Sequence, residues 1–167
     1  MSLQKHPSIA ELTRPMAPVG VLVIDDQPTV REGLARLIAS VPLTLRFVGS
    51  AATSAEALRA AARLRPAVVV LDVDLAGEDG LALIPKLAAN ASVLVLSSRG
   101  DPATRARAAR LGARAFIEKH QPAAELLHSI ADLAYPKPNR DKTTKQQGTS
   151  AHSDVAAPSV VARPLRS

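Results

Sequence analysis

The sequence predicts an α/β fold with a parallel sheet, and two observations support it. Five short segments rich in Val, Leu, Ile and Ala are spread over residues 19–135. Between them lie segments whose apolar residues recur at intervals of three and four, as on one face of a helix. Strands that alternate with helices form parallel sheets with right-handed crossovers. Five such units predict a flavodoxin-like, doubly wound, five-stranded parallel sheet with strand order 2-1-3-4-5.

The predicted strands differ in how they are covered. Four are apolar at nearly every position, which indicates strands that are buried on both faces. In the second, Leu43, Leu45 and Phe47 alternate with Thr44 and Arg46, which favours an edge strand with one face nearer water. The predicted strands are Val19–Ile24, Leu43–Val48, Ala67–Leu71, Val93–Leu96 and Ala115–Ile117.

Capping residues and prolines mark the ends of the predicted helices. Thr53 and Glu56 have the spacing of a capping box before an Ala-rich helix. Asp101, followed by Pro102, fits an N-cap and a first helical residue. Pro85 would remove a backbone hydrogen bond inside the third helix and kink it. The predicted helices are Thr29–Ser40, 53–65, Gly80–Asn90, a fourth that begins after Asp101 and a fifth that begins at Pro122.

The fourth predicted helix has mostly small residues at its expected core-facing positions, which are Ala103, Ala106, Ala109 and then Leu111. Burial stabilises by about 25 cal/mol per Å² of apolar surface, so an alanine face anchors a helix less firmly than a leucine face. We therefore expect this helix to be loosely held, as elements that switch between two arrangements are.

Composition excludes several classes of function. The absence of Cys excludes disulfides, thiolate catalysis and Cys-ligated zinc. Residues 19–135 hold 13 Lys and Arg against 12 Asp and Glu, so most of the net charge of +6 lies in residues 136–167. A nearly neutral folded part and a tail with few aromatic residues argue against direct DNA binding.

Both ends of the chain lack the patterns of folded elements. Residues 1–18 form a polar leader without the apolar run of a signal peptide. Residues 136–167 are rich in Pro, Ser, Thr and Lys, which predicts a disordered basic tail after a domain at residues 19–135. No segment approaches the roughly 18 apolar residues that span a membrane, so we expect a cytoplasmic protein.

Polar side chains follow four of the five predicted strands. Because the carboxyl ends of parallel strands meet at one edge of the sheet, these residues should share one pocket. They are Asp25, Asp26, Asp72, Asp74, Ser97, Ser98 and Lys119.

Such a pocket suits phosphoryl chemistry. Clustered carboxylates repel one another, and a hard divalent cation such as Mg²⁺ relieves that repulsion. One carboxylate can then attack phosphorus and form an acyl phosphate. Lys119 and Ser97 would hold the remaining phosphoryl oxygens and offset their charge.

Four segments in this order resemble the successive signatures of bacterial response-regulator receiver domains. The resemblance covers residues 19–135. The segments are Val-Leu-Val-Ile-Asp25-Asp26-Gln-Pro, Val-Val-Leu-Asp72-Val-Asp74-Leu-Ala-Gly-Glu-Asp-Gly80, Val-Leu-Ser97-Ser98 and Gly112-Ala113-Arg-Ala-Phe116-Ile-Glu-Lys119.

The resemblance implies roles for these residues. Asp72 would be the phosphoacceptor of a sensor histidine kinase or a phosphotransfer protein in a two-component phosphorelay. Mg²⁺ would bind Asp25, Asp26, Asp72 and the backbone carbonyl of Asp74. A further set would bind the phosphoryl group or report its presence: Ser97 and Lys119 as phosphoryl ligands, and Ser97 and Phe116 as the switch.

The finer resemblance is to receivers that precede a helix-turn-helix DNA-binding domain, yet residues 136–167 show no helical pattern. We therefore expect a stand-alone receiver whose output is contact with a downstream protein. It would act on no outside substrate and catalyse only its own aspartyl phosphorylation and dephosphorylation. A homodimer would form through the fourth helix, fifth strand and fifth helix.

Two alternatives remain open at this point. The segment Asp72-Val-Asp74 after a buried strand also resembles haloacid-dehalogenase-type phosphatases, although their acidic metal pair comes last in the chain and here the pair comes first. Turnover of a generic phosphomonoester would distinguish the two classes. A degenerate receiver used only as a binding scaffold is the second alternative, and the complete set of polar residues argues against it.

Overall fold

The computed structural model describes residues 17–136, so the predicted leader and tail lie almost entirely outside the described residues. Five parallel strands form the main sheet in the order β2-β1-β3-β6-β7. This order confirms the predicted doubly wound topology. The strands are β1 (Val19–Ile24), β2 (Leu45–Ala51), β3 (Val68–Asp72), β6 (Ser92–Ser97) and β7 (Ala115–Glu118).

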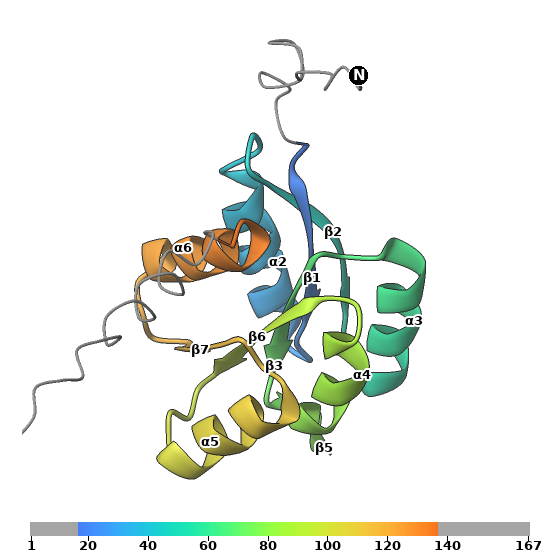
Figure 1. The fold of residues 1–167 in the computed structure, drawn as a ribbon, viewed down its shortest axis with the longest axis vertical. Helices are drawn as coiled ribbons and strands as arrows, with labels where there is room; N and C mark the ends of the chain where they lie inside the picture. Colours follow the sequence, from blue (N-terminus) through green and yellow to red (C-terminus); the bar gives the residue numbers. More distant parts are fainter. Residues whose placement is uncertain (1–16, 137–167) are drawn as a thin grey trace, which may run out of the picture. The chain divides into compact units, whose positions relative to one another are not determined.

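Helices cover both faces of this sheet (Figure 1). One face packs against α2 (Pro28–Ala39) and α6 (Ala123–Ala134). The other packs against α3 (Ser54–Leu64), α4 (Ile84–Ala88) and α5 (Pro102–Leu111). None of the helices in residues 17–136 is long and apolar enough to cross a membrane.

The two-sided cover explains the continuous apolar runs in the sequence. In β1, Val21 and Val23 pack toward α2 and α6, whereas Leu22 and Ile24 pack toward the opposite helices. A strand that is buried on both faces needs apolar residues at successive positions rather than at alternate ones.

The second strand begins later than the sequence predicts. Leu43 was expected to start it, but the strand runs over Leu45–Ala51 and Leu43 is 88% exposed. The backbone N–H groups of Thr44 and Leu45 both donate to the carbonyl of Val41, so Leu43 lies in a turn. The predicted position at the edge of the sheet is confirmed, since β2 pairs only with β1 in the described part of the chain.

The two predicted helix caps are present. Thr53 accepts a hydrogen bond from the backbone N–H of Glu56, and the Glu56 carboxylate accepts one from Ala52. Asp101 accepts from the N–H of Thr104, and Pro102 is the first residue of α5. These side chains satisfy donors that the first turn of a helix leaves free.

The third predicted helix, Gly80–Asn90, is wrong as a single element. Gly80–Leu83 forms a 3₁₀ turn, and the α-helix that follows spans only Ile84–Ala88. Pro85 therefore lies in the first turn of α4 and does not kink a longer helix. A proline is tolerated there because the N–H that it lacks has no partner within the helix.

The face that α5 turns to the core also differs from the prediction. Ala103, Ala106 and Ala109 are exposed, and Ala108 is the one fully buried residue of the helix. Thr104 and Leu111, one turn to either side of it, are half-buried. The helix is thus rotated relative to the prediction, and Arg105 and Arg107 contact groups on either side of it, as described below.

A short hairpin that the sequence analysis did not predict follows β3. It consists of β4 (Asp74–Leu75) and β5 (Glu78–Asp79), paired antiparallel. Its turn residues Ala76 and Gly77 have φ angles of 56° and 87°. Positive φ at both central residues is typical of the tight turns that join hairpin strands.

Candidate functional site

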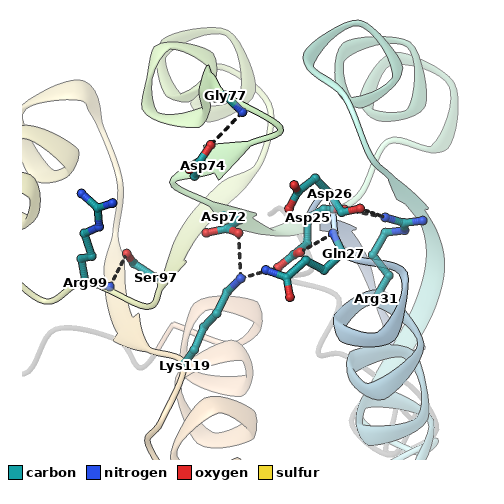
Figure 2. A network of polar contacts seen from close by, with 10 residues as sticks. All are labelled: Asp25, Asp26, Gln27, Arg31, Asp72, Asp74, Gly77, Ser97, Arg99 and Lys119. Atoms are coloured by element: carbon teal, nitrogen blue, oxygen red, sulfur yellow. Dashed lines mark hydrogen bonds and ion pairs between the residues drawn. The ribbon is translucent and has the colours of Figure 1, made fainter.

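Three of the predicted polar residues meet at the carboxyl ends of β1, β3 and β7. Asp25 follows β1, Asp72 is the last residue of β3, and Lys119 follows β7. The Lys119 Nζ donates to Oδ2 of Asp25 at 2.8 Å and to Oδ2 of Asp72 at 2.7 Å (Figure 2). The parallel topology thus brings together residues that are far apart in the sequence.

These charged groups are largely removed from water. The side chains of Asp25, Asp72 and Lys119 are 2%, 8% and 19% exposed. Buried charges are costly unless they are paired and hydrogen-bonded. The lysine supplies that partner for both carboxylates at once.

The surroundings shift the protonation of two of the groups. Burial, with a contribution from the Asp25 carboxylate, raises the pKa of Asp72 above its ordinary value of 3.8, and the hydrogen bond from Lys119 offsets only part of this. Burial disfavours the Lys119 ammonium, but its hydrogen bonds to Asp25 and Asp72 outweigh that effect and raise the pKa of Lys119. The Asp72 carboxyl thus holds its proton more readily than an exposed aspartate does, whereas Lys119 is favoured in its charged form.

The acidic cluster has the chemistry of a site for a hard divalent cation. Carboxylate oxygens of Asp25, Asp26 and Asp72 lie within 4.8 Å of one another. Three carboxylates and the Lys119 ammonium leave a formal charge of −2, which a divalent cation would balance. Oxygen donors in small number, with room for water, suit Mg²⁺.

Asp74 contributes differently from the other three aspartates. Its carboxylate Oδ1 accepts from the backbone N–H of Gly77 at 3.0 Å and caps the hairpin turn (Figure 2). The prediction assigned only the Asp74 backbone carbonyl to the metal, and the orientation of the side chain toward the turn is compatible with that assignment.

Two further residues hold the turn that carries Asp25 and Asp26. The backbone N–H of Gln27 donates to Oδ1 of Asp25 at 2.9 Å. The Arg31 Nη1 donates to the backbone carbonyls of Asp25 and Asp26 at 2.8 and 2.9 Å (Figure 2). Sequence reasoning assigned no role to either residue, because the contact between the Arg31 side chain and these carbonyls depends on how α2 follows the turn in the folded chain.

Ser97, at the end of β6, is buried but is not bonded to the aspartates. Its Oγ accepts from the backbone N–H of Arg99 at 3.0 Å (Figure 2). The serine nevertheless lines the same open pocket of about 420 Å³ as Asp26, Asp72 and Lys119. Ser98 lines it as well. The pocket leaves space beside Asp72 for a phosphoryl-sized group.

The predicted switch residue, Phe116, is half-buried in β7. Its ring lies beneath the Arg105 guanidinium, 4.4 Å from the ring centroid. Arg105 also donates to the Phe116 carbonyl and forms an ion pair with Glu118 at 3.0 Å. On the other side of α5, Arg107 pairs with Asp79 of the hairpin. Arg105 and Arg107 thus connect α5 to β7 and to the hairpin, respectively.

Fold and site together define a doubly wound α/β domain with an acidic, lysine-bound cluster at its strand ends. Residues 21–131 match the family model described as the response regulator receiver domain. The chain belongs to this family, whose members are the receiver domains of two-component regulatory systems. The family match confirms the resemblance seen in the sequence and favours it over the phosphatase alternative.

Similar proteins agree with this assignment. A protein-glutamate methylesterase/protein-glutamine glutaminase of Anaeromyxobacter dehalogenans is 30% identical over 162 residues, 88% of this chain and 43% of that protein. The receiver domain of NarL from Mycobacterium tuberculosis is 30% identical with a TM-score of 0.66, covering 72% of this chain and 98% of that one.

A third match is a response regulator from Burkholderia pseudomallei, solved with a phosphorylated aspartic acid, a calcium ion and citrate. It is 28% identical with a TM-score of 0.62 and covers 70% of this chain and 68% of that one. The chain spans about half the length of the first curated relatives that it matches.

Proposed function

We propose that this receiver accepts a phosphoryl group on Asp72 from a sensor histidine kinase or a phosphotransfer protein. The observation that carries the proposal is the Asp72 carboxylate itself, which is buried, raised in pKa and bonded to Lys119 inside an acidic cluster. The phosphorylated aspartic acid and the calcium ion in the Burkholderia pseudomallei regulator support the same chemistry.

In the proposed reaction, a carboxylate oxygen of Asp72 forms a bond to phosphorus. The bond between phosphorus and the imidazole nitrogen of the donor's phosphohistidine breaks, and the electron pair remains on that nitrogen. The Lys119 ammonium neutralises charge on the phosphoryl oxygens, and its Nζ already lies 2.7 Å from Oδ2 of Asp72. The Ser97 hydroxyl would exchange its contact with Arg99 for a phosphoryl oxygen.

Mg²⁺ would be held by Asp25, Asp26, Asp72 and the backbone carbonyl of Asp74. When bound, a divalent cation there offsets the charge of the carboxylates and of the incoming phosphoryl group. The protein's own part is to hold the carboxylates within one ligand sphere and to exclude the bulk of the solvent. The burial of Asp25 and Asp72 serves that role.

Output is proposed to be contact with a downstream protein, with no activity on outside substrates. Phosphorylation would draw Ser97 toward the phosphoryl group and allow Phe116 to turn inward. The surface of α5 and β7 would then change, because Arg105 of α5 contacts Phe116 and Glu118 of β7. A homodimer through α5, β7 and α6 is the proposed assembly on that face.

The experiment is to treat the protein with acetyl phosphate and to follow its intact mass with and without Mg²⁺. One phosphoryl group should be added only when Mg²⁺ is present. Asp72→Asn should prevent the addition, whereas Asp132→Asn, on the exposed side of α6, should leave it unchanged. Phosphorylation that survives Asp72→Asn at full stoichiometry would overturn the proposal.

A further inference from the structure

The geometry points to Arg31 as a positioning residue that holds the Asp25–Asp26 turn in the form that binds a divalent cation. This inference rests on the proposed function, because it assumes that the acidic cluster takes Mg²⁺. It assigns to Arg31 no contact with the ion and none with the phosphoryl group.

Arg31 is placed to fix that turn. One guanidinium nitrogen, Nη1, donates to two consecutive backbone carbonyls, those of Asp25 at 2.8 Å and Asp26 at 2.9 Å. Its own backbone N–H donates to Gln27, in the first turn of α2. The helix is anchored in the core by Leu34 and Ile38, so the guanidinium is presented from a rigid element.

The two aspartates depend on Arg31 to different degrees. The Asp25 side chain is also held by the N–H of Gln27 and by Lys119. Within residues 17–136, the Asp26 carboxylate has no hydrogen bond or ion pair of its own. The direction of the Asp26 carboxylate is therefore set by its backbone, and Arg31 holds the carbonyl of that backbone.

The cationic charge of Arg31 is aimed at the backbone. In the described part of the chain it forms no ion pair with the carboxylate of Asp25 or Asp26. A nearby positive charge that acted only through its field would repel a divalent cation, and its removal would tighten binding. Removal of a residue that orients the metal ligands has the opposite effect. Loss of hydrogen bonds that hold metal-binding residues in place typically weakens metal binding about 10–100-fold.

The two roles predict opposite changes in Mg²⁺ affinity when Arg31 is removed. Calorimetric titration of Mg²⁺ into the full chain therefore distinguishes them. Arg31→Met, which keeps much of the side-chain length but has no donor, should raise the Kd for Mg²⁺ about 10–100-fold. Arg36→Met is the matched control, because Arg36 lies on the same helix with its side chain 79% exposed and, within residues 17–136, pairs only with Glu32. It should leave the Kd unchanged.

A second variant and a second readout separate positioning from loss of folding. Arg31→Lys keeps a charged donor and should recover part of the lost affinity while melting at nearly the wild-type temperature. The Mg²⁺ concentration that half-saturates phosphorylation by acetyl phosphate should follow the same order as the Kd, highest in Arg31→Met, lower in Arg31→Lys and lowest in the wild type. A lower melting temperature with an unchanged Kd would mean that Arg31 is merely structural and would overturn the inference.

The outcomes also separate this inference from the proposed function. If the wild-type protein binds no Mg²⁺, the proposed metal site is wrong. If the wild-type protein binds Mg²⁺ and Arg31→Met binds it equally or more tightly, the site stands and the positioning role of Arg31 is refuted.

Discussion

Arg105 should control how firmly α5 is held, and Arg105→Met tests this. The guanidinium stacks on Phe116, donates to the Phe116 carbonyl and pairs with Glu118. The apolar anchoring of α5 is weak, since Ala108 is its one fully buried residue. The contacts of Arg105 therefore add to a weak apolar attachment, and Phe116 must leave this contact if it is to turn inward.

The free energy that Arg105 contributes to holding α5 can be estimated from these contacts. A cation over an aromatic ring at a partly exposed site contributes about 0.5–1 kcal/mol. An exposed ion pair contributes about 0.2–1 kcal/mol, and the side chains of Arg105 and Glu118 are 46% and 25% exposed. Together they amount to roughly 0.7–2 kcal/mol, which changes an opening equilibrium by a factor of roughly 3–30.

The assay is amide hydrogen exchange, which reports local opening. Arg105→Met should raise exchange rates across residues 102–118 by about that factor and leave β1 and β3 unaffected. Arg110→Met is the control, because Arg110 is exposed on the same helix and its side chain has no partner within residues 17–136. Equal exchange in the two variants, or an increase spread over the whole sheet, would show that Arg105 does not hold α5.

Three further predictions concern the site and the tail. Asp26→Ala should weaken Mg²⁺ binding and raise the melting temperature in metal-free buffer by relieving carboxylate repulsion; unchanged values of both would count against a shared site. Because the pKa of Asp72 is raised in the folded state, the folded state binds a proton first as the pH falls. The unfolding free energy of the metal-free wild type, measured by urea denaturation, should thus rise relative to Asp72→Asn as the pH falls toward 3.8, and a falling difference would contradict this. A chain that ends at Pro136 should melt cooperatively and be phosphorylated normally, and loss of the cooperative melt would show that the predicted boundary is wrong.

The polar cluster could be predicted from the sequence because the parallel topology determines where the residues that follow each strand lie. Once the strands were recognised from their apolar runs, the residues after them had to meet at one edge of the sheet. Asp25, Asp72 and Lys119 do meet there, although they are separated by tens of positions in the chain. Their roles in phosphorylation remain predictions.

Contacts of long side chains could not be predicted in the same way. The alanine spacing of α5 suggested a core face at Ala103, Ala106 and Ala109, but alanine is small enough to be either buried or exposed. In the structure, α5 instead faces its neighbours so that Arg105 pairs with Glu118 of β7 and Arg107 pairs with Asp79 of the hairpin. Such partners depend on tertiary distances that periodicity does not encode, and Arg31 was missed for the same reason.

Asp72 is proposed to carry the phosphoryl group, and a chemical trap for the acyl phosphate tests this directly. After phosphorylation with acetyl phosphate and Mg²⁺, borohydride reduces an aspartyl phosphate to homoserine, and peptide mass spectrometry then locates the reduced residue. We predict homoserine at position 72 and unmodified aspartate at positions 25, 26 and 74. Homoserine at position 25, 26 or 74, with position 72 unmodified, would contradict this prediction.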